Sequence, residues 1–534
     1  MERSDDASAA ADGRQLGGAM YVYNSVALGT MERHRLPENP SEPDIVYRHI
    51  QELRLFDSNP RLNLASYVTT WMEDPARQLI MDSLAVNHVD GAIYASSNDI
   101  EARCISIMAA LWHAPNPQNV MGCATVGSTE ACLLGGLNMK KWWAQRRKEK
   151  GLATDKPNLI VCSCFQVCWE KFAKYWDVEL RLGKLKEGSY TLTPEAVEEL
   201  ADENTIGVAA ILGSTYTGDL DDVQALSAMS DKLREKKGLE LPIHVDAASG
   251  GFVAPFLFPD LVWDFQLKNV MSISTSGHKY GLVYPGVGWA LWRTPEALHP
   301  DMVFHCAYLG TDQTNLTLNF SRPASHIVAS YYQLLRLGRS GFTQVNRNMQ
   351  EVALHLAQGL RDMGVFRIWN DPAKTVPMVT FSFKPKPSAS GATDATDPTE
   401  AAQPAEQMRA YTEFDLADTL KQSGWSLPAY PLAPDLSHTT VCRAVVRQEF
   451  SITLADKLLE DLKRALQWLD KHFEGKTRAD RDAQAAKTQE LHPLHTHLPH
   501  AIHKHQHSRG RSAAKGQGHA HGHSHNDKRS HPVC

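Results

Sequence analysis

The sequence has 534 residues, of which 43% are hydrophobic and 22% charged, and a formal net charge of −6. This length predicts about two to four domains, and the composition is that of a soluble globular protein without the roughly 20 consecutive apolar residues of a membrane span. After residue 475 there are ten Lys/Arg and four Asp/Glu, so the rest of the chain carries a net charge of about −12, which disfavours nucleic-acid binding. The acidic start MERSDDASAAADG is unlike a targeting peptide and favours a cytoplasmic location.

The chain is predicted to begin with an arm, residues 1–60, that contains one helix over DIVYRHIQELRLF. In residues 61–340, apolar runs of strand length alternate with longer amphipathic stretches, as in NLIVCS, IGVAAILGS, PIHVDAAS and MSISTS and the helical EACLLGGLNMKKWWAQRRKEK. This alternation is typical of a large α/β domain with a mostly parallel sheet covered by helices. Residues 341–473 are predicted to form a smaller C-terminal α/β domain that ends in the helix ADKLLEDLKRALQWLDKHF.

Two segments have a composition that argues against a packed core. Residues 384–407 are rich in Pro, Ala, Ser and Thr and are predicted to be a flexible surface insertion. Residues 474–534 are predicted to be a disordered tail, and 12 of the 24 histidines lie there between His492 and His531. The His-X-His clusters favour binding of nickel, copper or zinc, or a gain of charge as pH falls. We nevertheless expect the tail to have no role in catalysis.

The nine cysteines are scattered along the chain. The set Cys162, Cys164 and Cys168 lacks a second pair at the spacing of a zinc site. We therefore predict no metal in the functional site and interpret these residues as small buried hydrophobes in a reducing compartment.

A lysine and an aspartate mark the candidate site. The strand-like SISTSGHKYG ends on His278 and Lys279, and PIHVDAASGGF ends a strand on Asp246. An unpaired lysine is costly to bury, and a carboxylate after a buried parallel strand lies at the edge of the sheet where ligands bind. A lysine that can form a Schiff base, with a carboxylate for a pyridinium nitrogen, is the pair that pyridoxal 5′-phosphate requires.

A third motif, ATVGSTEACLLGG, precedes these two in the chain. Gly127 permits a close backbone approach, and Ser128 and Thr129 open a helix whose first N–H groups can bind an anion. Each signal alone is an ordinary cap, turn or surface residue. Their occurrence in the order phosphate site, aspartate, lysine favours a pyridoxal-phosphate enzyme.

Seven motifs together give the chain a resemblance to a family. VGSTEA, FQVCWEKFAKYWDVELR, STYTG, HVDAASGGFVAPF, SISTSGHKYG, LNFSRP and NLASYVTTWMEDP resemble glutamate decarboxylases of the plant, fungal and bacterial type, which are group II pyridoxal-phosphate-dependent decarboxylases. The resemblance implies the fold-type I architecture and a homodimer or higher homo-oligomer. It also implies conversion of L-glutamate to 4-aminobutanoate and CO2 through an external aldimine and a quinonoid intermediate.

The same resemblance assigns site residues. Lys279 would form the Schiff base with the cofactor, Asp246 would pair with the pyridine nitrogen, and Ser321 would reach the phosphate of the neighbouring subunit. Tyr308 lies on a loop that closes over the site and supplies a proton in related enzymes. The remaining cofactor residues would be Ser128, Thr129, Ser276 and His278 at the phosphate, Gln166 and Ala248 on the ring faces, and Thr215 at the ring substituents, with His278 also counted as catalytic.

For the substrate, the resemblance places Ser66 and Asp90 at the distal carboxylate and Arg443 near the α-carboxylate. The segment NHVDGAIYASS departs from the family pattern after Asp90. The tail carries no aromatic anchors after Phe473 and has no apolar helical stripe, so activation by calmodulin is not expected.

Two other functions stay open on the sequence. One is a different pyridoxal-phosphate-dependent amino acid decarboxylase, against which Gln166 and the NLASY segment argue. The other is a non-enzymatic metal-binding protein that uses the histidine tail. Visible absorbance from the bound cofactor would separate a pyridoxal-phosphate enzyme from a metal-binding protein.

Overall fold

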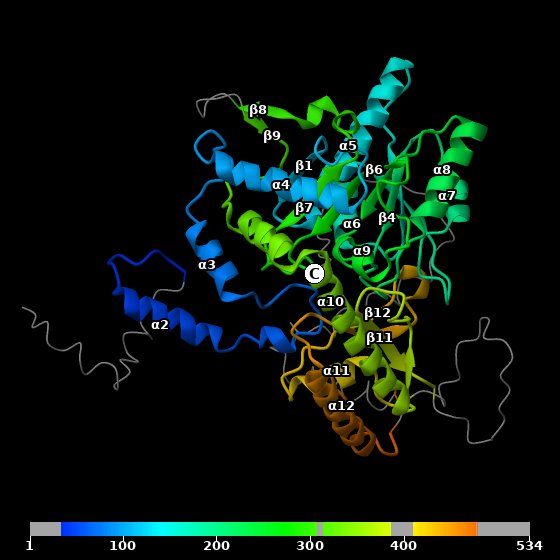
Figure 1. Cartoon of the computed structure of the whole chain (residues 1–534). Coiled ribbons are helices and arrows are strands. Elements are labelled where there is room, and N and C mark those ends of the chain that lie inside the picture. Colours follow the sequence, from blue (N-terminus) through cyan, green and yellow to red (C-terminus); the bar gives the residue numbers. More distant parts are fainter. Residues whose placement is uncertain (1–33, 307–312, 386–408, 477, 479–534) are drawn as a thin grey trace, which may run out of the picture. The chain divides into compact units, whose positions relative to one another are not determined.

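The computed structural model describes residues 34–306, 313–385, 409–476 and 478 (Figure 1). The predictions for Tyr308, for most of the insertion 384–407 and for nearly all of the tail 474–534 therefore fall outside the described residues. The chain divides into two units, Met1–Asn59 and Pro60–Cys534, which are considered separately. In the first unit, helix α2 (Pro43–Arg54) begins with a proline in its first turn and buries none of its residues. The sequence had predicted this helix over 44–56.

The second unit is built around a seven-stranded sheet with the order β1-β7-β6-β5-β4-β2-β3. All neighbouring strands are parallel except β7, which runs antiparallel to both β1 and β6. This confirms the mostly parallel sheet predicted from the sequence. The strands are β1 (Met121–Thr125), β2 (Asn158–Cys162), β3 (Glu179–Gly183), β4 (Thr205–Ile211), β5 (Ile243–Asp246), β6 (Val270–Ser276) and β7 (Gly288–Trp292).

Helices cover both faces of this sheet, which explains why its inner strands read as unbroken apolar runs. Every residue of β2, β4 and β5 is buried. Helix α5 packs against β6 and β7, and it buries Trp143 while Lys141 and Lys148 are exposed. The helices are α3 (Asp74–Asp82), α4 (Ala95–Leu111), α5 (Ser128–Glu149), α6 (Val167–Tyr175), α7 (Pro194–Leu200), α8 (Val223–Lys237) and α9 (Ala254–Leu257).

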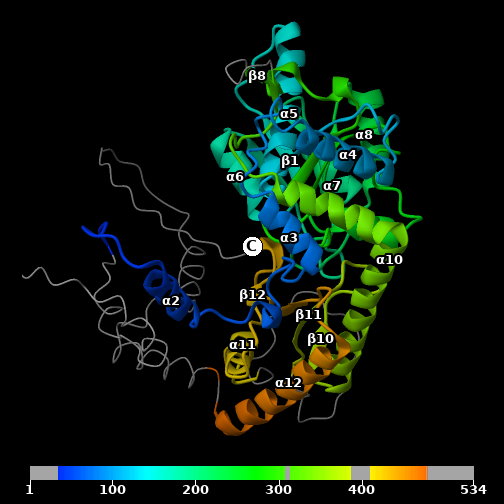
Figure 2. The ribbon, with the colours of Figure 1, turned by 60° about the vertical axis from the view of Figure 1, so that its left-hand side comes forward.

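Helix α10 (Ser325–Asp362) connects the large sheet to a smaller one (Figure 2). It contacts α3 and α4, and it also contacts β10 and α12. Between these contacts it kinks at Gly338, whose φ of 57° is in the left-handed region that glycine adopts without strain. The predicted boundary between residues 340 and 341 falls just after this kink and stays a prediction.

The smaller sheet is antiparallel, with the order β10-β11-β13-β12. Helices α11 and α12 pack against each other beside it, and a separate two-stranded hairpin, β8 and β9, belongs to the larger part. The remaining elements are β8 (Phe304–Cys306), β9 (Gln313–Asn315), β10 (Phe366–Ile368), β11 (Met378–Phe383), α11 (Glu413–Lys421), β12 (Ala429–Pro431), β13 (Thr440–Val445) and α12 (Ile452–His472). No helix of the described residues is long and apolar enough to cross a membrane.

Candidate active site

Two parallel strands end at the same edge of the large sheet and carry the predicted charged pair. Strand β5 ends at Asp246 and β6 at Ser276, and Lys279 follows three residues later. The Ser276 amide donates to the carbonyl oxygen of Ala248 at 3.2 Å, and Lys279 Nζ donates to Ser249 Oγ at 3.4 Å. The loops after both strands are thus joined, and they bring the amine and the carboxylate into one site at the edge where ligands bind in such sheets.

The Asp246 carboxylate is only 5% exposed and each of its oxygens accepts a hydrogen bond. Oδ1 accepts from the Ala248 amide at 3.2 Å, and Oδ2 accepts from Trp169 Nε1 at 3.0 Å. The Cys168 thiol lies 3.9 Å from Oδ2. Neutral donors therefore hold a buried negative charge at the end of β5.

The Lys279 amine is buried, and this burial lowers its pKa, while the nearby Asp246 carboxylate opposes the shift. Its Nζ lies 5.1 Å from the centre of the Tyr67 ring. The lysine backbone is held as well, because Thr69 donates from its amide to the His278 carbonyl and from its hydroxyl to the Lys279 carbonyl, both at 2.8 Å. A fixed lysine with a lowered pKa is the form of this residue that can act as a nucleophile.

The start of α5 is the segment for which the sequence predicted an anion site. Gly127 is the N-cap residue and offers no side chain to the first N–H groups of the helix, and Ser128 and Thr129 follow it half-buried. Gly288 of β7 is so close that a Cβ there would meet Ser128 N at 2.6 Å, so a glycine is needed for this approach. Gly288 pairs with Ser276, whose buried Oγ has no hydrogen-bond partner among the described residues. An uncapped helix start beside an unpaired buried hydroxyl fits a phosphate group.

The His278 ring lies over this helix start. A Cβ at Gly127 would be 3.1 Å from His278 Cε1. The ring Nδ1 accepts from the amides of Gly286 and Val287 at 3.3 Å each, which assigns the ring proton to Nε2. Burial, helped by the Lys279 charge, lowers the pKa of His278 to about 4, so the ring is neutral above this pH and carries its N–H at Nε2.

The other residues that the sequence predicted at the cofactor ring lie around this site. Gln166 caps α6, where its Oε1 accepts from the Cys168 amide at 2.7 Å, and Cys168 in turn faces Asp246. Ala248 is half-buried beside Asp246. The carbonyl oxygen of Thr215 accepts from the hydroxyl of Tyr67 at 3.2 Å. Each of the three residues is thus joined to Asp246 or Lys279 directly or through one intervening residue.

Arg443 on β13 is the charged residue that the smaller sheet brings to the site. Its guanidinium donates to the carbonyl oxygens of Thr215 and Ala65 and lies 5.0 Å from the centre of the Tyr67 ring. Among the described residues nothing accepts a hydrogen bond from its buried Nε. Ser66 lies in the same segment, where its Oγ accepts from the Val68 amide at 3.1 Å. Lys279 and Arg443 therefore share Tyr67 as a common neighbour.

Asp90 and Ser321 lie together, and no contact among the described residues joins them to Lys279. Asn87 Nδ2 donates to Asp90 Oδ2 at 3.1 Å, and Asn87 Oδ1 accepts from the amide of Arg322 at 3.2 Å. Ser321 itself is exposed. Of the sequence-predicted residues that the structure describes, these two have no contact that joins them to Lys279 of their own chain.

Three residues that the sequence analysis did not single out contact the site. They are Tyr67 beneath the lysine and arginine, Ser249 at the lysine amine, and Trp169 at the aspartate. Tyr67 and Trp169 lie inside the motifs NLASYVTTW and FQVCWEKF, but only the fold shows which way their side chains point.

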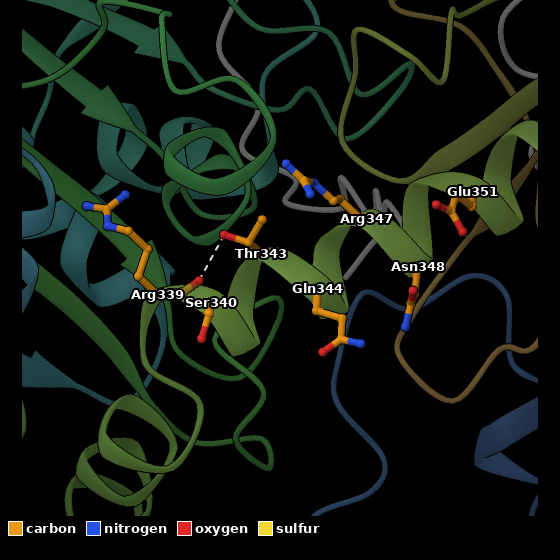
Figure 3. Close-up of a pocket in the computed structure, with 7 residues that line it drawn as sticks. All are labelled: Arg339, Ser340, Thr343, Gln344, Arg347, Asn348 and Glu351. Carbon is orange, nitrogen blue, oxygen red and sulfur yellow. Dashed lines mark hydrogen bonds between the residues drawn. The ribbon is translucent and has the colours of Figure 1, made fainter.

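A hollow elsewhere in the described residues does not belong to this site. It has a volume of about 850 Å³ and lies along α10 after the kink (Figure 3). Its lining residues are Arg339, Ser340, Thr343, Gln344, Arg347, Asn348 and Glu351. Because all seven come from one helix and none belongs to the constellation around Lys279, the hollow is not part of the site.

The clustered cysteines are buried, as the sequence predicted, but they point in two directions. Cys162 and Cys164 have their sulfur atoms 3.0 Å apart. Cys168 turns instead toward Asp246 and Cys132, and their ligand atoms lie within 4.8 Å of one another. The prediction that the site uses no metal is not tested by this arrangement.

A second buried histidine supports a prediction about acid stability. His244 on β5 is bonded through both ring nitrogens to the hydroxyls of Ser272 and Ser274, at 2.8 and 3.0 Å, and burial lowers its pKa to about 3. In the unfolded chain an imidazole titrates near pH 6.5. Below that pH the unfolded state binds a proton that the folded state does not bind, so protonation stabilises the unfolded state. Compared with His244→Gln, the wild type should lose about 1.4 kcal/mol of unfolding free energy between pH 7.5 and 5.5. Chemical denaturation of both proteins at the two pH values measures this, and parallel pH dependences would contradict the prediction.

Comparison with known proteins places the chain in a family. The model of the pyridoxal-dependent decarboxylase conserved domain matches residues 37–384. A glutamate decarboxylase of Petunia hybrida is 42% identical over 468 residues, which cover 87% of this chain and 89% of the relative. A glutamate decarboxylase of Aliivibrio fischeri is 40% identical over 452 residues, covering 84% of this chain and 93% of the relative.

Solved structures agree with this family assignment. A glutamate decarboxylase of Lactobacillus brevis superposes with a TM-score of 0.77 at 37% identity, covering 84% of this chain and 97% of that chain. A TDC from Oryza sativa, at 15% identity and a TM-score of 0.67 over 82% of this chain and 90% of that one, shares the fold alone. The fold and the lysine–aspartate site thus define a fold-type I pyridoxal-phosphate enzyme. The chain belongs to the pyridoxal-dependent decarboxylase family and is a pyridoxal-phosphate-dependent carboxy-lyase.

Proposed function

We propose that this chain removes the α-carboxyl group of L-glutamate to give 4-aminobutanoate and CO2. The observation that carries this substrate is the identity of 40–44% to glutamate decarboxylases of plants and bacteria over most of the chain. The fold-type I architecture alone is shared with enzymes of other specificity and does not select glutamate.

Residues around Lys279 fit pyridoxal phosphate. The unpaired Ser276 hydroxyl and the uncapped start of α5 suit the phosphate, with Ser128, Thr129 and His278 as further donors. Asp246 suits the pyridine nitrogen, and Gln166, Ala248 and Thr215 would border the ring. When bound, the cofactor withdraws electrons from the bond that breaks at the substrate's Cα.

The chain's own residues determine which bond at Cα breaks and where the proton goes. Arg443 presents a buried Nε that could bind the α-carboxylate, while Ser66, and Asp90 from a second subunit, would hold the distal carboxylate. Two fixed points orient the substrate, and orientation decides loss of CO2 over loss of the α-proton. A donor must then protonate Cα, a role we propose for Tyr308, so each turnover consumes one proton.

Purified protein supplied with pyridoxal phosphate tests the substrate directly. CO2 release and proton uptake should be seen with L-glutamate and be at least about 100-fold lower in kcat/KM with aspartate or aromatic amino acids, since a site that binds a distal carboxylate rejects substrates that cannot reach it. Faster turnover of any other amino acid would overturn the proposal in favour of a different decarboxylase.

We also propose a homodimer in which Asp90 and Ser321 complete the site of the neighbouring subunit. Three large apolar side chains are exposed beside them: Ile93 at 71%, Leu318 at 51% and Val126 at 49%. Glu130 ties this surface to the anion site, because one carboxylate oxygen accepts from the Leu318 amide and the other from the Val126 amide, both at 2.8 Å. An apolar surface next to two polar residues that no contact among the described residues joins to Lys279 of their own chain suits a second copy.

Mixed dimers provide the test of this assembly. Lys279→Ala and the double variant Asp90→Ala/Ser321→Ala should each be nearly inactive alone. Coexpressed in equal amounts, they should recover about one quarter of the wild-type rate, because half of the dimers are mixed and one of their two sites is intact. No recovery in dimers shown to be mixed would mean that these residues serve their own chain.

We propose a cytoplasmic location on the state of the cysteines. Seven cysteines whose side chains the structure describes are free and buried, as in proteins of a reducing compartment. Fractionation of the source cells with detection of the protein would test this.

A further inference from the structure

The floor of the site beneath Asp246 is made of aromatic and neutral polar side chains. Trp169 of α6 is fully buried, and its Nε1 donates to Asp246 Oδ2 at 3.0 Å. Its ring meets the rings of Phe172 and His244 edge to face, with centroids 6.0 and 5.5 Å apart. Because both neighbouring rings are themselves buried or hydrogen-bonded, the indole cannot turn away from the carboxylate.

The orientation of the Asp246 carboxylate depends on such donors. Its two oxygens accept from the Ala248 amide and from the Trp169 indole, and the Trp169 bond comes from a side chain that mutation can change. The histidine behind the indole adds no charge, because burial lowers the pKa of His244 to about 3. A hydrogen bond from a neutral donor to a buried carboxylate favours its ionised form and fixes its orientation.

We propose that Trp169 is a positioning residue that holds the Asp246 carboxylate correctly oriented for the cofactor's pyridine nitrogen. This inference rests on the proposed role of Asp246. Trp169 does not contact substrate in this scheme and acts only through the carboxylate. Its loss should therefore lower cofactor affinity and kcat and leave the KM for glutamate nearly unchanged.

Trp169→Phe removes the N–H and keeps an aromatic ring. Trp143→Phe is the matched control, because Trp143 is also buried, at 3% exposure, and donates from Nε1 to the carbonyl oxygen of Glu203 at 3.1 Å. The Trp169 variant should bind pyridoxal phosphate about tenfold more weakly, in titrations of the full chain freed of cofactor, and lose about 10- to 100-fold in kcat, as expected for one hydrogen bond to a charged group. KM should change less than about threefold, and the control should retain wild-type values.

Two further measurements separate positioning from packing. Replacing Trp169 by 3-benzothienylalanine, which keeps the size of the indole and lacks the N–H, should reproduce the loss even where the phenylalanine variant does not fold. In the Asp246→Asn background, Trp169→Phe should lower cofactor affinity no further, since the bond acts through the carboxylate.

The outcomes distinguish this inference from the proposed function. If the benzothienyl variant keeps cofactor affinity and kcat within about twofold of wild type, or if the effects of Trp169 and Asp246 add, Trp169 is not a positioning residue. If Asp246→Asn itself changes neither quantity, the assigned role of Asp246 fails and the inference fails with it.

Discussion

Lys279→Ala is expected to fold normally and to lose essentially all turnover. Lys279 is the lysine whose amine lies buried beside Asp246, at 3.4 Å from Ser249 Oγ, and burial lowers its pKa toward the range where the neutral amine can react. Without this amine, the cofactor cannot be bound covalently or exchanged onto the substrate, a loss of about 10³-fold or more. The visible absorbance of the bound cofactor should change together with the rate.

The design of that experiment separates chemistry from stability. Lys268→Ala is a suitable control, because Lys268 is 67% exposed and pairs with Asp231 on the surface, so it should keep the wild-type rate and spectrum. Thermal unfolding should show both variants folded. A Lys279→Ala protein that turns over glutamate at more than a few per cent of the wild-type rate would show that another amine serves the reaction.

The fold could be predicted largely from the sequence, since the pattern of its strands has a simple physical origin. Strands buried on both faces must be continuously apolar, so IGVAAILGS and PIHVDAAS were recognisable as the inner strands β4 and β5. The position of Asp246 after a buried parallel strand also predicted that it lies at the edge of the sheet where ligands bind. The antiparallel strand β7 was not foreseen, because GWALW has the same apolar character as its parallel neighbours.

The contacts around the two charged residues could not be predicted in the same way. Nothing in the sequence indicates that Trp169 points at Asp246 or that Tyr67 lies between Lys279 and Arg443, since these contacts join residues 77 or more positions apart. Periodicity reports which face of an element is buried and leaves open what that face touches. The same limit on predicting contacts applies to Asp90 and Ser321, which are proposed to act in a second copy of the chain.

Asp246→Asn is expected to keep the cofactor, when it is supplied in excess, and to lower kcat by about 10²- to 10³-fold. The carboxylate is 5% exposed and accepts two N–H bonds, from Ala248 and from Trp169. An asparagine has one acceptor oxygen and an NH2 group, so one of these two N–H donors must face the donor NH2 group. The substitution also removes the charge that keeps the pyridine nitrogen of the cofactor protonated.

The rate loss should therefore exceed that of Trp169→Phe, which removes one of the donors and leaves the charge. Single-turnover rates with glutamate at saturating cofactor measure it. Asp222→Asn is the control, because Asp222 caps α8 through the Ala225 amide on the exposed surface and asparagine is an equally good cap. A rate for Asp246→Asn within about threefold of this control would mean that the carboxylate does not support the charge of the cofactor ring. The acidic partner of Lys279 would then have to be sought elsewhere in the chain.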